Sequence, residues 1–110
     1  MDDIEQFLFE CQCESKNVEV INAPDTGCLD DRSMIDYWCK ETGLNIELAR
    51  FQCPATGEFC TKEKLDGAHV LVVNHEDWGY FITPVLSSFN RSRNDTHFWV
   101  KPEHLIKAPK

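Results

Sequence analysis

The sequence predicts a single α+β domain spanning all 110 residues. Three observations predict this class. Apolar residues recur at helical spacing in the first half of the chain, and β-branched and aromatic residues form short runs in the second half. Where the two halves meet, a glycine-containing turn is flanked by two cysteines. The hydrophobic fraction of 42% is that of a globular chain, and a chain of this length can bury a core.

Helices are expected mainly in the N-terminal half. Residues 2–11 form a short amphipathic pattern with an acidic N-cap at Asp2 or Asp3. Residues 30–42 form the strongest helical pattern, with an aspartate at the start and Gly43 at the stop. Pro84 is expected to start a further short helix that covers residues 85–91.

Strands are expected wherever β-branched and aromatic residues cluster between turn residues. The predicted strands cover residues 17–22, 46–51, 68–73, 80–83 and 98–100. Residues 68–73 and 80–83 are separated by a polar turn and should pair as a hairpin. Residues 102–106 are expected to close the chain as a turn or helix.

The run Cys53-Pro-Ala-Thr-Gly-Glu-Phe-Cys60 carries the strongest chemical signal in the sequence. Two thiols on either side of a tight turn can supply half of a metal site, so Cys53 and Cys60 are the candidate metal ligands, with zinc as the candidate cofactor. Shortly after them, His69 opens an apolar strand-like run. The resulting order is a two-cysteine turn, a hairpin and a short helix.

This order resembles the small treble-clef, HNH-like zinc-finger proteins. The resemblance covers residues 52–108 and rests on the cysteine pair followed by Gly67-Ala68-His69-Val70, Ile82-Thr83-Pro84, Asn90 and Phe98-Trp99-Val100. It implies a treble-clef-like ββα core over residues 52–108. Residues 1–51 would then be an N-terminal embellishment of helices and a strand.

The resemblance also exposes a departure from the family pattern. A treble clef takes two zinc ligands from its helix, but Leu86 and Phe89 stand where that second pair is expected, and neither can bind a metal. The chain is therefore expected to be a degenerate member, with its remaining thiols packed in a core. The missing ligands could alternatively come from elsewhere in the chain, and the candidates are Cys11 with Cys13, His75 and His97.

In a nuclease of this family, His69 would be the general base acting with a divalent metal. That chemistry also needs a helix ligand, for which the sequence offers Asn90 and Asn94, and a group that orients the histidine. Gly79 stands where an orienting asparagine is expected, so the set is incomplete. The competing interpretation of His69 is a partly buried residue that is hydrogen-bonded to backbone.

The formal net charge is −8, which disfavours direct binding of a nucleic-acid backbone and favours a basic protein partner. The longest apolar stretch, Val70 to Val73, is too short to cross a membrane, so no membrane partner is expected. The acidic N-terminus does not resemble a signal peptide. We therefore expect a cytoplasmic protein with reduced cysteines.

An exposed tryptophan beside acidic residues suits a protein interface, because aromatic residues are frequent hot spots. The candidate partner-binding residues are Trp78, Trp99, Glu76 and Asp77. The sequence thus predicts a non-catalytic, acidic protein-interaction module, in one form an inhibitor or nucleic-acid mimic. The alternatives are a metal-dependent HNH-type endonuclease that uses His69 and a zinc-stabilised structural module.

Overall fold

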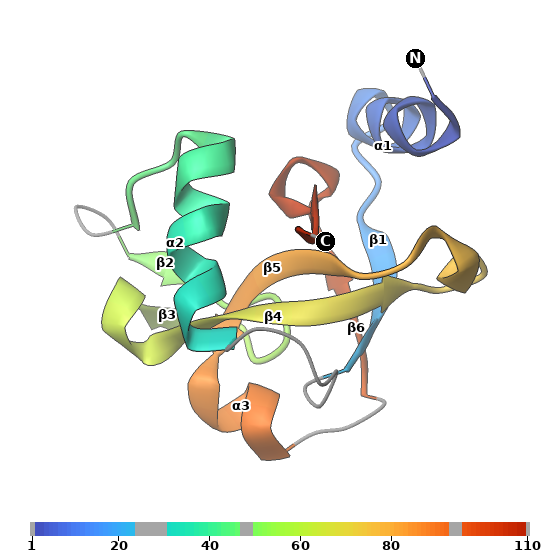
Figure 1. Ribbon diagram of the computed structural model, residues 1–110. Coiled ribbons are helices and arrows are strands. Elements are labelled where there is room, and N and C mark those ends of the chain that lie inside the picture. The colour runs from blue at the N-terminus through green and yellow to red at the C-terminus, as the bar shows by residue number, and fades with distance from the viewer. Residues whose placement is uncertain (1, 24–30, 47–49, 93–95, 110) are drawn as a thin grey trace.

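The computed structural model describes residues 2–23, 31–46, 50–92 and 96–109 (Figure 1). Both helices and strands occur in these ranges, and the strands pair antiparallel, which confirms the α+β class. The helices are α1 (Asp3–Cys13), α2 (Asp31–Thr42) and α3 (Ser87–Ser92). The strands are β1 (Val18–Asn22), β2 (Phe51–Gln52), β3 (Phe59–Cys60), β4 (Leu65–Val72), β5 (Phe81–Leu86), β6 (His97–Val100) and β7 (Ile106–Lys107). Single 3₁₀ turns are η2 (Lys62–Lys64), η3 (Glu76–Trp78) and η4 (Pro102–His104).

The main sheet has five strands in the order β6-β1-β4-β5-β7, and each neighbouring pair is antiparallel. The hairpin β2–β3 forms a separate two-stranded sheet around the cysteine turn. Strand β1, from the N-terminal half, lies between β6 and β4. Residues 1–51 therefore supply part of the central sheet, which corrects the expectation that they only embellish a core formed by residues 52–108.

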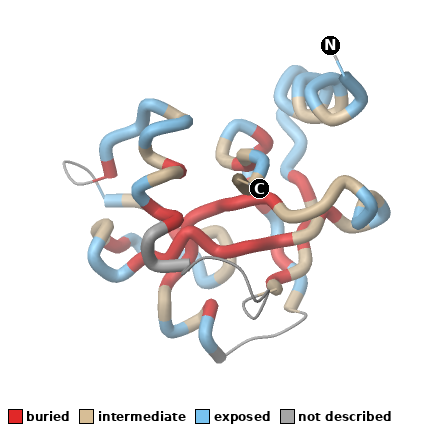
Figure 2. Tube along the Cα trace, viewed as in Figure 1, coloured by how far each residue is buried: buried red, intermediate tan, exposed pale blue. Residues whose placement is uncertain are grey.

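Strand β4 has a helix against each of its faces. Gly67 faces α2 so closely that a Cβ atom at this position would lie 2.5 Å from the backbone carbon of Met34. The preceding residue, Asp66, points to the opposite face because side chains alternate along a strand. There its carboxylate accepts hydrogen bonds from Ser87 and Asn90 of α3. The sheet is therefore buried on both sides along β4 and β5, as Figure 2 shows.

The core between α2 and the C-terminal segment is closed by Trp38, which is fully buried. Its indole Nε1–H donates to the carbonyl oxygen of His104 at 2.8 Å. The Trp38 ring also meets the rings of Phe51 and His104 edge-on, with centroids 5.7 Å away in each case. This cluster joins α2, the β2–β3 hairpin and η4 into one packed unit.

Two predictions of helix ends are confirmed. Asp2 caps α1, with its carboxylate accepting from the Glu5 N–H at 2.7 Å. Gly43 follows α2 with a φ of 73°, a conformation that glycine adopts without strain. Among the residues that the structure describes, no helix is both long and apolar enough to cross a membrane. The sequence offers Asp30 or Asp31 as the cap of the second helix; Asp30 lies outside the described residues, as does the candidate ligand Asn94, and Asp31 is the first residue of α2.

The prediction that Pro84 starts a helix is wrong. Pro84 lies inside β5, opposite Gly67, and α3 begins only at Ser87. Strand β7 pairs with Phe81 and Ile82 alone, so the rest of β5 is an edge on that side. Proline is tolerated at a sheet edge, where its missing N–H is not needed for pairing.

Candidate functional site

The cysteine pair lies on one side of the β2–β3 hairpin. Cys60 is opposite Phe51, so Cys53 is its diagonal neighbour across the two strands. Both side chains are buried. The Leu86 N–H donates to the Cys53 thiol at 3.4 Å, and the Cys60 thiol donates to the Phe51 carbonyl at 3.7 Å. The hairpin thus holds its two sulfurs beside the junction of β5 and α3.

A metal at this junction would need further ligands. Leu86 is itself buried in the core, and Phe89 packs edge-on against Phe98 with ring centroids 5.7 Å apart. Burial and the neighbouring Cys53 raise the pKa of the Cys60 thiol. Within the described ranges, no cluster of three or more His, Cys, Asp or Glu side chains is arranged to hold a metal ion.

The alternative ligands proposed from the sequence lie elsewhere in the fold. Cys11 and Cys13 are on α1, which packs against η4. His75 stacks on Trp78 with ring centroids 4.0 Å apart, at the turn between β4 and β5. His97 lies on the edge strand β6, where its Nδ1 is 2.8 Å from a Glu19 carboxylate oxygen. Among the described residues, these side chains and the two thiols do not form a group that could hold a metal ion.

His69 and α3 are on different faces of the sheet. The pairing of β4 with β5 is regular from Leu65 to Val70, so side-chain alternation continues unbroken. His69 therefore shares the face of Gly67, which α2 covers, whereas Asp66 faces α3. The His69 side chain is 3% exposed, and its ring meets Tyr80 edge-on. The histidine and the candidate helix ligand Asn90 are not brought together.

Between β4 and α3, where a nuclease site was expected, the structure has a buried cluster of polar side chains. The Asp66 carboxylate accepts from Ser87 Oγ at 2.7 Å and from Asn90 Nδ2 at 3.0 Å, and the Arg91 Nε lies 3.6 Å from it. The Asn22 amide in turn donates to the Asn90 carbonyl at 3.4 Å. This cluster fixes α3 to β4 and β1. Sequence reasoning did not identify it, although an aspartate leading into an apolar run was a usable signal.

The candidate interface residues near η3 serve mainly local structure. Trp78 is half-buried, with its ring against His75 and edge-on to Phe7 of α1 at 5.3 Å. Exposed Glu76 accepts the Asn74 N–H at 2.9 Å. Backbone N–H groups of Glu76 itself and of Asn74 hold the pKa of this carboxyl below its usual range. Asp77 is exposed in the same turn.

Trp99, by contrast, projects from the surface and is 56% exposed. The register of β6 with β1 places it opposite Glu19. Its side chain lines two neighbouring hollows, each of which continues along a different part of the surface. Of the two tryptophans predicted to bind a partner, Trp99 is therefore the exposed one, whereas Trp78 is half-buried.

The first hollow, which we call the acidic hollow, has a volume of about 370 Å³. It lies between α1, the start of β1 and the turn after β4, and its charged lining comprises Glu10, Glu14, Lys16 and Glu19. The lysine is engaged with Glu14 at 3.1 Å. The carboxylates therefore outnumber the cation beside Trp99.

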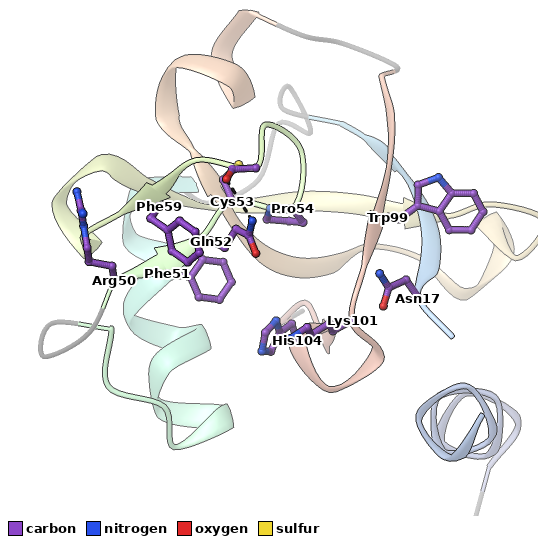
Figure 3. A pocket seen from close by; sticks show the side chains of 11 residues that line it. Asn17, Arg50, Phe51, Gln52, Cys53, Pro54, Phe59, Trp99, Lys101 and His104 are labelled. Carbon is purple, nitrogen blue, oxygen red and sulfur yellow. Dashed lines mark hydrogen bonds between the residues drawn. The ribbon is translucent and has the colours of Figure 1, made fainter. Parts of the chain in front are cut away.

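The second hollow, which we call the aromatic hollow, has a volume of about 420 Å³ and lies between the β2–β3 hairpin, η4 and the end of β6 (Figure 3). Its walls include Arg50, Phe51, Phe59, Trp99, Lys101 and His104. The rings of Phe51 and His104 are in contact, with centroids 5.3 Å apart. Burial lowers the pKa of His104, which favours its neutral form.

Comparison of the chain with family models, with curated proteins and with solved structures produced no match. The resemblance to treble-clef, HNH-like proteins thus stays a prediction that rests on the motifs of the sequence. What the chain does has to be argued from its own surface.

Proposed function

We propose that this chain is a non-catalytic protein-interaction module that binds a basic segment of a partner protein. The observation that carries the proposal is Trp99, a large aromatic side chain left 56% exposed at the edge of the acidic hollow. Aromatic residues of this kind are common hot spots, because they bury a large apolar area with few rotatable bonds.

Charge supports the choice of a basic partner. The carboxylates of Glu10, Glu14 and Glu19 line the hollow beside Trp99, and the whole chain carries a net charge of −8. A field of this sign accelerates encounter with cationic segments and repels anionic ones. In a partner segment with an apolar residue flanked by lysines or arginines, the apolar residue would contact Trp99 and the cations would face the carboxylates of the acidic hollow.

One form of this function is inhibition. A small acidic domain can occupy the basic surface with which another protein binds nucleic acid, and so act as a nucleic-acid mimic in the cytoplasm. The net charge of −8 supports this form, and the same charge disfavours direct binding of DNA or RNA by the chain itself.

The proposal is tested by selecting peptides from a random library displayed against the immobilised protein. We expect the selected peptides to be rich in lysine and arginine with an apolar residue among them, and to bind more weakly as salt is raised. Trp99→Ala should weaken binding by at least roughly tenfold, the effect of losing an interface anchor.

A matched control is Phe9→Ala on the outer side of α1, because Phe9 is exposed to a similar extent, 54%, and does not line the acidic hollow. This variant should bind the selected peptides like the wild type. Selection of acidic or neutral peptides, or equal binding by the Trp99→Ala protein, would contradict the proposal.

The competing nuclease function is tested separately with plasmid DNA and Mg²⁺ or Mn²⁺. An HNH-type mechanism needs His69 and a ligand of α3 on the same side of a shared metal, whereas the strand register places them on opposite faces. We expect no cleavage above that of the His69→Ala variant. Cleavage that this substitution abolishes would overturn the non-catalytic assignment.

A further inference from the structure

The aromatic hollow differs in chemistry from the rest of the molecule. Its walls present the rings of Phe51, Phe59, Trp99 and His104. Phe59 and Trp99 are 58% and 56% exposed, so these rings are available to a ligand. Figure 3 shows Phe51, Phe59, Lys101 and His104 between the hairpin and η4, with Arg50 and Trp99 at opposite ends of the row of labelled side chains. A volume of about 420 Å³ is within the range of small-molecule sites.

The charge of this hollow is opposite to that of the chain. Acidic residues outnumber basic ones by 19 to 11 in the whole sequence. Arg50 and Lys101 nevertheless line the hollow, and among its described lining residues none is Asp or Glu. Among the described residues, neither cation forms an ion pair.

The two features specify complementary parts of a ligand. Flat rings favour a planar aromatic group, which stacks offset or edge-on against them. The cations favour an anionic group, with the Arg50 guanidinium suited to a carboxylate or phosphate because it can donate two parallel hydrogen bonds. A long polyanion is disfavoured by the charge of −8 on the whole chain.

We propose that the aromatic hollow is a binding site for a small anion that carries a planar aromatic ring. Aryl carboxylates and nucleoside monophosphates both have this chemistry. The ring lies among Phe51, Phe59 and Trp99, and the anionic group is held by Arg50 and Lys101. This site shares Trp99 with the acidic hollow, but its charged side chains are cationic, whereas carboxylates predominate in the acidic hollow.

The test is a titration of the ¹⁵N-labelled protein followed by NMR, with adenosine monophosphate and indole-3-acetate as probes and with adenosine and indole-3-acetamide as their uncharged counterparts. At least one anion should bind and shift the amide signals around Phe51, Phe59 and Lys101. Its uncharged counterpart should bind roughly tenfold more weakly, since it cannot form charge-assisted hydrogen bonds with the cations.

Variants separate a built site from general attraction. Lys101→Gln and Arg50→Gln should each weaken anion binding by roughly tenfold, and Phe59→Ala should weaken binding of the anion and its counterpart alike. Lys40→Gln, which removes an equal charge at an exposed position of α2, is the control and should bind like the wild type.

The proposal is overturned if neither anion shifts these signals at millimolar concentration, or if the shifts map elsewhere. Equal weakening by Lys40→Gln and Lys101→Gln would also overturn it, because attraction would then be unspecific. These readouts use no basic peptide and leave Trp99 intact, so failure here is distinguishable from failure of the proposed interaction function.

Discussion

At the scale of single residues, the partners supplied by the fold decide the roles of chemically similar side chains. Four histidines occur in the chain. His69 is enclosed between the sheet and Tyr80, His75 stacks on Trp78, His97 pairs with Glu19, and His104 packs against Trp38 and Phe51. A histidine in sequence is a candidate base or ligand, but each of these rings is engaged in packing or pairing.

His104 predicts a dependence of stability on pH. Burial lowers its folded-state pKa below the ordinary value of 6.5, so the unfolded chain binds more protons in this region of pH. Its contribution is therefore present above about pH 6.5 and is lost as pH falls through the lowered folded-state value. The free energy of unfolding in urea should decrease when the pH is lowered from about 7.5 to about 5.5.

The control for this prediction is His104→Phe. This variant keeps an aromatic ring against Trp38, and its backbone carbonyl at position 104 still accepts the hydrogen bond from the Trp38 indole. The decrease in unfolding free energy should be smaller in this variant than in the wild type. An equal decrease in both proteins would show that other groups cause the pH dependence.

At the scale of elements, the contact of α2 with β4 depends on the absence of a side chain. A Cβ atom at Gly67 would lie 2.5 Å from the Met34 carbonyl carbon and 2.7 Å from the Ile35 nitrogen. Both are backbone atoms of the helix, which cannot move aside as a flexible side chain can. The helix therefore approaches the sheet at this point as closely as glycine allows.

Gly67→Ala should lower the free energy of unfolding by roughly 1–3 kcal/mol, the range for overpacking a core, as measured by urea denaturation. The loss should appear even though alanine is intrinsically better than glycine in a strand. Adding Met34→Ala should not restore stability, because the clash is with the helix backbone. Restoration by the double substitution, or a gain from Gly67→Ala alone, would contradict this account.

At the scale of the whole molecule, side-chain packing and hydrogen bonds hold the helices against the sheet. Leu86 and Phe89, which stand at the positions expected for metal ligands, pack against protein instead. The buried Asp66 cluster then ties α3 to the sheet with hydrogen bonds. The junction that zinc would hold in a treble clef is therefore joined by other contacts in this chain.

Removal of metal should accordingly leave the fold intact. Elemental analysis of the purified protein should find far less than one zinc per chain, and EDTA should leave the thermal midpoint unchanged, because the two thiols lack further ligands among the described residues. Cys53→Ser should give the same zinc content as the wild type. One zinc per chain, lost in Cys53→Ser, would establish the zinc-stabilised module instead.

The sequence by itself determined the fold class and most of the elements. Helical spacing with caps at Asp2 and Gly43 located α1 and α2, and β-branched runs located β1, β4 and β6, because these signals act between residues close in the chain. The same kind of local signal indicates the order of cysteine turn, hairpin and helix. Trp99 was identified as a candidate interface residue for the same local reason.

The tertiary structure alone decided which of these side chains meet. Whether His69 faces α3 depends on strand register, whether Leu86 fills the junction depends on packing, and whether Trp99 or Trp78 is exposed depends on where α1 lies. The aromatic hollow combines Arg50 and Phe59 of the hairpin region with Lys101, which lies far along the chain. Such juxtapositions arise from long-range contacts, which leave no periodic signal in the sequence.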